Sequence, residues 1–167
     1  LPALSEVARS DPAKLRTIHY KLRVPGDLVL LFLAGLLFAS GQLVIDLLYD
    51  PRYSAAGGML QILALSLIAV RYGVTQQIYL AMGVPRYQAI INIVRFIALY
   101  SLVPLLYFIG GTQAALWGIS LHGLAIAPFI YRFNAKLGVN DLRIELLVLF
   151  ALPIGFGCGL ALNHLWK

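Results

Sequence analysis

Charged side chains are scarce in this sequence. Only 12% of its 167 residues are Asp, Glu, Lys or Arg, whereas 60% are hydrophobic and the mean hydropathy is +0.84. Soluble domains are usually about 25% charged, so this chain has too few polar side chains to cover a soluble globule. Lipid must cover it instead. The composition predicts an all-α integral membrane protein, because a backbone in lipid has to satisfy its own hydrogen bonds.

Cysteine and the motifs of catalysis are also nearly absent. Cys158 is the single cysteine, which excludes an intrachain disulfide. The sequence has no cluster of metal ligands, no glycine-rich nucleotide loop and no Ser-His-Asp spacing. We therefore expect no catalytic residue, no metal and no cofactor. The net charge of +6 indicates membrane topology rather than a nucleic-acid partner.

Long apolar runs make up most of the chain. A span needs roughly 20 such residues. Five spans are expected, at residues 27–49, 57–83, 87–109, 113–131 and 142–166. Asp50-Pro51, Val84-Pro85 and Gly110-Gly111 are the turn signals between the first four. Residues 1–26 differ, because basic side chains alternate there with apolar ones at helical spacing, which predicts an amphipathic linker at the membrane surface.

The basic residues indicate which way the bundle faces. With residues 1–26 in the cytoplasm, the inner segments hold nine Lys or Arg and the outer segments hold two. This predicts a multi-pass protein of the cytoplasmic (inner) membrane, in contact with its lipids. An odd number of spans and a start at Leu1 lead us to expect a piece of a larger bundle, whose N-terminal half is a further partner.

Arg71 lies in the middle of the second expected span. An arginine at that depth costs about 2.5–3.5 kcal/mol on insertion scales, so water, an acidic partner or an anionic substrate must compensate for it. Its helix has a polar arc of about 140°, and the third span has one of about 60°. The residues expected to face a substrate cavity are Arg71, Tyr72, Gln76 and Tyr79 in the second span, with Asn92 and Arg95 in the third.

The fourth span contains His122 near its centre, a candidate for proton coupling because histidine exchanges a proton near neutral pH. The acidic residues near the spans, Asp27, Asp46, Asp50 and Glu145, are all expected close to the membrane interfaces. Arg71 is thus expected to have no acidic partner at its own depth and to receive an anion. For Arg71 the alternative is a structural role, such as a salt bridge to a helix outside this chain. For Arg95 it is snorkelling to the membrane surface, and for His122 it is an ordinary buried histidine held by hydrogen bonds.

Four stretches carry a resemblance to a known family. They are LLYDPRYSAAGGMLQILAL at 47–65, LAMGVPR at 80–86, LPALS at 1–5 and DPAKL at 11–15. Together they resemble the polysaccharide flippases of the Wzx type, in the superfamily that also holds multidrug-extrusion (MATE) transporters and the lipid II flippase. The resemblance covers nearly the whole chain, and the last two stretches resemble the cytoplasmic loop after the second helix of the family's C-terminal half.

The resemblance implies a protein of about 12–14 helices in two repeated halves, of which this chain is part of the second. It implies translocation of an anionic lipid-linked oligosaccharide, a polyprenyl-diphosphate sugar, across the cytoplasmic membrane by alternating access. Arg71 and Arg95 match in type the basic residues of the family's cavity. Polysaccharide polymerase and export machinery would be further partners.

Two other functions are weaker candidates. A multidrug transporter for cationic drugs needs carboxylates in its cavity, and this chain offers few. A membrane-embedded enzyme of polysaccharide assembly needs a long outer loop with catalytic groups. The longest loop here, residues 132–141, is expected inside.

Overall fold

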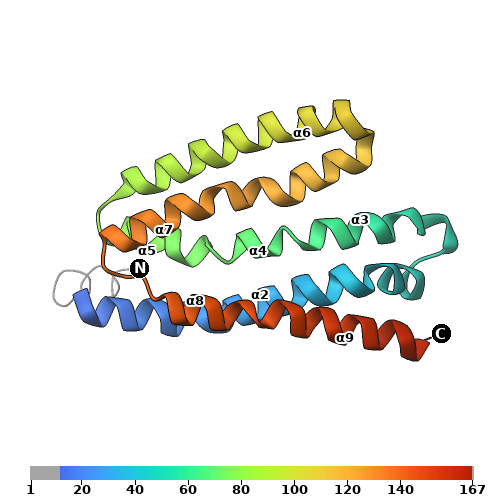
Figure 1. Cartoon of the computed structure of the whole chain (residues 1–167), viewed down its shortest axis with the longest axis horizontal. Helices are drawn as coiled ribbons and strands as arrows, with labels where there is room; N and C mark the ends of the chain where they lie inside the picture. The colour runs from blue at the N-terminus through green and yellow to red at the C-terminus, as the bar shows by residue number, and fades with distance from the viewer. Residues whose placement is uncertain (1–11, 167) are drawn as a thin grey trace.

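The computed structural model describes residues 12–166, all of whose regular elements are helices (Figure 1). Four helical stretches in this range are long and apolar enough to cross a membrane: Thr17–Leu48, Ala55–Ala81, Pro85–Lys136 and Leu142–Trp166. For the described residues, the prediction of an all-α protein with helices able to span a membrane is thereby confirmed.

The first helix is longer than the first expected span. Helix α2 runs from Pro12 to Leu48 and spans about 55 Å at 1.5 Å per residue, more than the hydrocarbon core of roughly 30 Å. The expected boundary at residue 26 is therefore not a helix break, although residues 1–11 of the predicted linker lie outside the described range. Pro25 sits within α2, and Arg23 and Asp27 form an ion pair across the turn that contains it.

The second stretch is divided into three short helices. These are α3 (Ala55–Ala64), α4 (Leu67–Val70) and α5 (Gly73–Ala81), preceded by the short 3₁₀ helix η1 (Pro51–Tyr53). At the first break the hydroxyl of Ser66 donates to the carbonyl of Leu63 (2.7 Å) and competes with the backbone ladder. The second break is at Arg71 and Tyr72. Tight turns inside a helix are typical of hinges.

The third stretch comprises α6 (Pro85–Leu121), the 3₁₀ helix η2 (His122–Ile126) and α7 (Ala127–Lys136). Gly110 and Gly111 leave the helical conformation within α6, and the chain reverses its direction there (Figure 1). Gly111 has φ 66°, a region that glycine enters without steric cost. The turn predicted at Gly110-Gly111 is therefore present.

The last stretch, α8 (Leu142–Leu149) and α9 (Ala151–Trp166), lies beside α2 and runs in the same direction (Figure 1). Glycines let these helices approach closely. A methyl group on Gly155 would collide with the backbone of Phe32, and one on Gly35 would collide with that of Leu152. Close contact through small residues is the usual packing of membrane helices.

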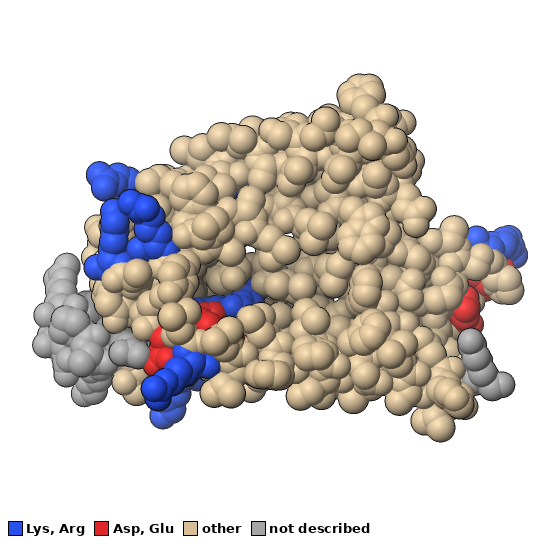
Figure 2. Space-filling view, in the orientation of Figure 1, with Lys and Arg blue, Asp and Glu red and all other residues tan. Residues whose placement is uncertain are grey.

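The starts of α2, α6 and α8 lie at one end of the bundle, which we call the basic end (Figure 1). Exposed basic residues gather there: Lys21, Arg86, Arg132, Lys136 and Arg143. In Figure 2 most charged side chains visible on this face lie near the two ends, a further group of both signs lies deeper in a hollow toward the basic end, and the rest of the face is uncharged.

Candidate functional site

Arg71 has an acidic partner within this chain. Its Nη2 lies 2.6 Å from Oε2 of Glu145, and the arginine is only 4% exposed. The expectation of an arginine without a carboxylate at its depth is therefore wrong. The reason lies in the segment before α8: Val139 is buried, and the backbone N–H of Asp141 donates to the hydroxyl of Tyr20 (2.7 Å). This segment packs against α2, and Glu145, in the first turns of α8, reaches the break between α4 and α5.

Glu145 also binds a second arginine. Nη1 and Nη2 of Arg23 donate to its two carboxylate oxygens at 2.5 and 3.0 Å, the bidentate geometry that guanidinium and carboxylate favour. Nε of Arg23 lies 2.9 Å from Oδ2 of Asp27. We call Arg23, Asp27, Arg71 and Glu145 the ionic cluster. It joins α2, the break before α5, and α8.

The ionic cluster has two positive and two negative side chains and is formally neutral. The ring of Tyr72 adds to it, with the guanidinium carbons of Arg71 and Arg23 at 5.0 and 5.5 Å from the ring centre. A neutral cluster attracts a diphosphate less than a bare arginine would. Sequence reasoning missed Arg23 and Glu145, because both lay in segments expected at the membrane surface.

The polar arc of the second span mainly joins helices. His19 Nε2 lies 3.2 Å from the Thr75 hydroxyl, and the buried hydroxyl of Tyr79 donates to Oδ1 of Asn134 (2.7 Å). The amide of Gln88 donates to that of Gln76 (3.0 Å), which connects the second stretch to α6. Gln76 and Tyr79 were expected in a cavity, and both are buried in helix contacts. Asn92, expected beside them, is exposed on α6.

A first polar cavity adjoins the ionic cluster. It has a volume of about 190 Å³. Its polar lining consists of Arg71, Tyr72, Tyr131, Asn134, Asn140 and Glu145. Of the expected residues it contains Arg71 and Tyr72. Because Glu145 already binds Arg71, this cavity offers a mixed rather than a cationic lining.

A second cavity of about 190 Å³ brings together two expected residues from different spans, Arg95 and His122. Ser66, Ala69, Val70, Ser120 and Gly123 complete its lining. Its walls come from the second stretch, from α6 both before and after the reversal at Gly110-Gly111, and from η2. Nδ1 of His122 lies 2.6 Å from the carbonyl oxygen of Ile119, which leaves Nε2 for a second contact.

Arg95 has no carboxylate partner within residues 17–166, where side chains are described. The acidic residues of that range have other contacts. Asp27 and Glu145 are in the ionic cluster, Asp46 accepts from Gln42, Asp50 pairs with Arg52, and Asp141 caps α8. Arg95 lies ten residues into α6, about 15 Å along the helix from its start.

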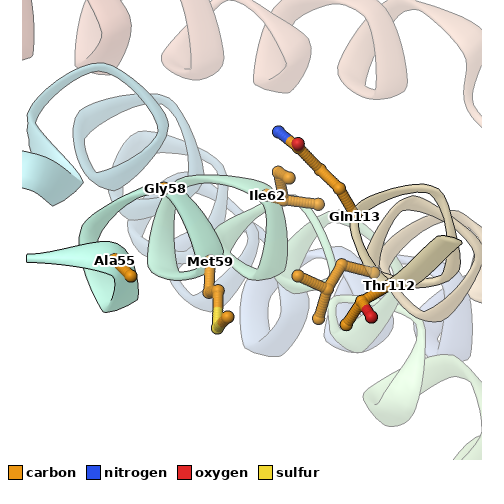
Figure 3. A pocket seen from close by; sticks show the side chains of 7 residues that line it. Ala55, Gly58, Met59, Ile62, Thr112 and Gln113 are labelled. Atoms are coloured by element: carbon orange, nitrogen blue, oxygen red, sulfur yellow. The ribbon is translucent and has the colours of Figure 1, made fainter. Parts of the chain in front are cut away.

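A third cavity, of about 230 Å³, lies at the end of the bundle opposite the basic end (Figure 1), and Figure 3 shows its lining. Met59 and Ile62 of α3 face Thr112 and Leu116 of α6 across it. No charged side chain lines it, so it offers nothing that would bind an anion. The described residues also contain no group of three His, Cys, Asp or Glu side chains that could hold a metal ion.

No family model, curated protein or solved structure matches the chain. The link to flippases therefore rests on the sequence stretches quoted above. Any function has to be argued from the sites themselves, and in the cavity with Arg95 and His122 no acidic residue of the described range neutralises the arginine.

Proposed function

We propose that this chain is part of a transporter that moves a lipid-linked oligosaccharide across the cytoplasmic membrane. The substrate class is a polyprenyl-diphosphate sugar, and the transporter binds and releases it by alternating access without a chemical step. Two independent arguments support this proposal: the resemblance to Wzx-type flippases, and a cationic cavity enclosed by apolar helices. The rest of the transporter would supply the other wall of the pathway. The whole transporter would then have about 12–14 helices.

The observation that carries the proposal is the pair Arg95 and His122 in one cavity. An arginine near mid-membrane needs water or an anion to offset a cost of about 2.5–3.5 kcal/mol. Within residues 17–166 no carboxylate neutralises Arg95. Guanidinium donates two parallel hydrogen bonds to phosphate oxygens, and the free Nε2 of His122 can add a third contact.

We further propose that the chain crosses the membrane five times. The stretch Pro85–Lys136 has 52 residues, about 78 Å of helix, and a single crossing needs roughly 30 Å. The reversal at Gly110 and Gly111 divides it into two crossings. The start of α2, with its basic residues, would then face the cytoplasm and Trp166 the outside.

The contacts of Arg71 favour a positioning role over a binding one. Its partner Glu145 holds the second stretch at the point where α4 passes into α5. The second cavity contains Val70, and the first contains Arg71 and Tyr72, so this break separates the two. A movement there would change the shape of both cavities, as alternating access requires.

The test compares Arg95→Ala with Arg86→Ala in the full-length protein. Both residues are basic and lie on α6, but Arg86 is exposed at the basic end. A hydrogen bond to a charged group contributes about 1.5–3 kcal/mol, so Arg95→Ala should weaken binding of polyprenyl diphosphate by about 10- to 100-fold. Polysaccharide export should fall with it at unchanged membrane levels, whereas Arg86→Ala should behave like wild type.

Arg95→Lys should recover part of the binding, because lysine replaces the planar fork with a point charge. His122→Ala should weaken binding by a smaller factor than Arg95→Ala. Normal binding and export by Arg95→Ala would contradict the proposed function, and so would an equal loss in Arg86→Ala.

A further inference from the structure

The outer side of α7 has an apolar hollow of about 470 Å³. It is lined by Pro128, Phe129, Tyr131, Arg132 and Ala135. Residues 128, 131, 132 and 135 share one side of the helix, because three or four positions make about one turn. All of the lining residues are exposed, so the hollow opens to the surroundings of the bundle.

Basic side chains lie at one end of this hollow. Arg132 is part of its lining, and Lys136 follows four residues later on the same side of α7, about 6 Å further along the helix. Both are exposed, and neither forms an ion pair with an acidic residue whose side chain the structure describes. Arg86 lies at the same end of the bundle, where Figure 2 shows a group of Lys and Arg side chains.

The sequence of α7 is therefore apolar at its start and cationic at its end. In a membrane this order places the proline and aromatic side chains beside acyl chains and the two cations at the level of the headgroups. Tyr131, between the two parts, is suited to the boundary because its ring is apolar and its hydroxyl is polar.

We infer that this hollow is a binding site for an acidic phospholipid of the leaflet at the basic end. An acyl chain fills the apolar part against Pro128 and Phe129, and the headgroup phosphate binds Arg132 and Lys136. The uncompensated positive charge selects acidic over zwitterionic headgroups, as basic segments near a membrane surface do. The inference does not depend on the transport of an oligosaccharide.

A soluble phosphate fits the site less well. It would bind the two cations and leave the apolar hollow unfilled, whereas a phospholipid satisfies both parts at once. The oligosaccharide carrier shares the anionic head and the apolar tail. Competition with polyprenyl phosphate therefore separates a carrier site from a site for bulk lipid.

The experiment measures lipid selectivity in the full-length protein. The protein is reconstituted in vesicles that contain spin-labelled phosphatidylglycerol or phosphatidylcholine, and the fraction of immobilised label gives relative association constants. One exposed cation near the headgroups contributes about five-fold to binding of an acidic lipid. Arg132→Gln should lower the constant for phosphatidylglycerol by about that factor and leave phosphatidylcholine unchanged.

Arg143→Gln is the matched control. Arg143 is exposed in the first turn of α8, near the same end of the bundle but outside the hollow. It should leave selectivity unchanged. Ala135→Phe, which fills the part of the hollow nearest the two cations, should weaken both lipids alike.

Three results would overturn the inference. Equal losses in Arg132→Gln and Arg143→Gln would mean that the total charge of this end, not a site, selects lipid. Wild-type protein without preference for phosphatidylglycerol would mean that the hollow is covered by protein. Displacement of phosphatidylglycerol by trace polyprenyl phosphate would assign the site to the carrier instead.

Discussion

Glu145→Gln is the most informative perturbation of this bundle. The substitution keeps the size of the side chain and removes its charge. In the structure the carboxylate accepts from Nη1 and Nη2 of Arg23 (2.5 and 3.0 Å) and from Nη2 of Arg71 (2.6 Å). A neutral amide has one acceptor oxygen, so it cannot satisfy all three donors. Two buried guanidinium groups would then share one remaining carboxylate, Asp27.

The expected cost follows from burial. The side chains of Arg23 and Arg71 are 1% and 3% exposed, and that of Glu145 is 17% exposed. Removing one partner of a buried ion pair costs about 3–5 kcal/mol, because a charge is left in a medium that does not solvate it. The partial exposure of Glu145 places the expected loss at the lower end, about 3 kcal/mol.

The assay is reversible unfolding of the protein in mixed micelles, followed by helical circular dichroism. Asp46→Asn is the control, because Asp46 is exposed and accepts one hydrogen bond from Gln42 on the same helix. It should change the free energy of unfolding by less than about 1 kcal/mol. Glu145→Gln should also increase solvent exchange of the amides in α8, which loses its ionic contacts with α2 and with the break before α5.

The double variant Glu145→Gln with Arg71→Gln distinguishes the cluster from a general loss of packing. If the two side chains interact, the pair of changes should destabilise by less than the sum of the single changes, because the second removes the charge that the first leaves unpaired. Additive losses, or a loss below about 0.5 kcal/mol for Glu145→Gln alone, would refute the ionic cluster as a stabilising contact.

Two further predictions concern helix packing. Gly155→Ala should destabilise the bundle by about 1–3 kcal/mol, because its methyl group meets the backbone of α2. Gly157→Ala is the control: open space surrounds that position, so the free energy of unfolding should stay unchanged in the same assay. Tyr79→Phe should cost about 0.5–1.5 kcal/mol through the lost hydrogen bond to Asn134, and an unchanged midpoint would mean that this contact does not form.

The helical class and the turns were predictable from the sequence, because apolar runs and turn residues act locally. Gly110-Gly111 is the clearest case: two adjacent glycines in an apolar run predicted a reversal, and the backbone leaves the helix there. The close packing at Gly155 and Gly159 is likewise a local feature, because neither glycine has a side chain where α9 meets α2. Each of these features depends on a few neighbouring residues and on the bilayer thickness.

The partner of Arg71 was not predictable in this way. Glu145 follows it by 74 positions, and their contact depends on the height of α8 relative to the second stretch. A helical wheel gives the direction of a side chain around its own axis, but not the relative height of two helices. One residue of the sequence pointed to this packing: Val139 is apolar and follows Gly138 in a segment expected to be polar. In the structure Val139 is buried.

Arg71 and Arg95 were both cavity candidates in the sequence, since each is a cation within an apolar run, although Arg95 lies closer to the end of its run. The structure separates them by what surrounds them. Arg71 is on the side of the second stretch that faces α8, where an acid is available, and Arg95 shares a cavity with a histidine and two serines. A buried charge that is already paired gains little from an anionic ligand, because the ligand must first displace the carboxylate. An unpaired charge gains the whole interaction. An arginine within an apolar run therefore needs a partner for its charge. Whether a substrate can be that partner depends on whether a carboxylate of the protein already binds the arginine.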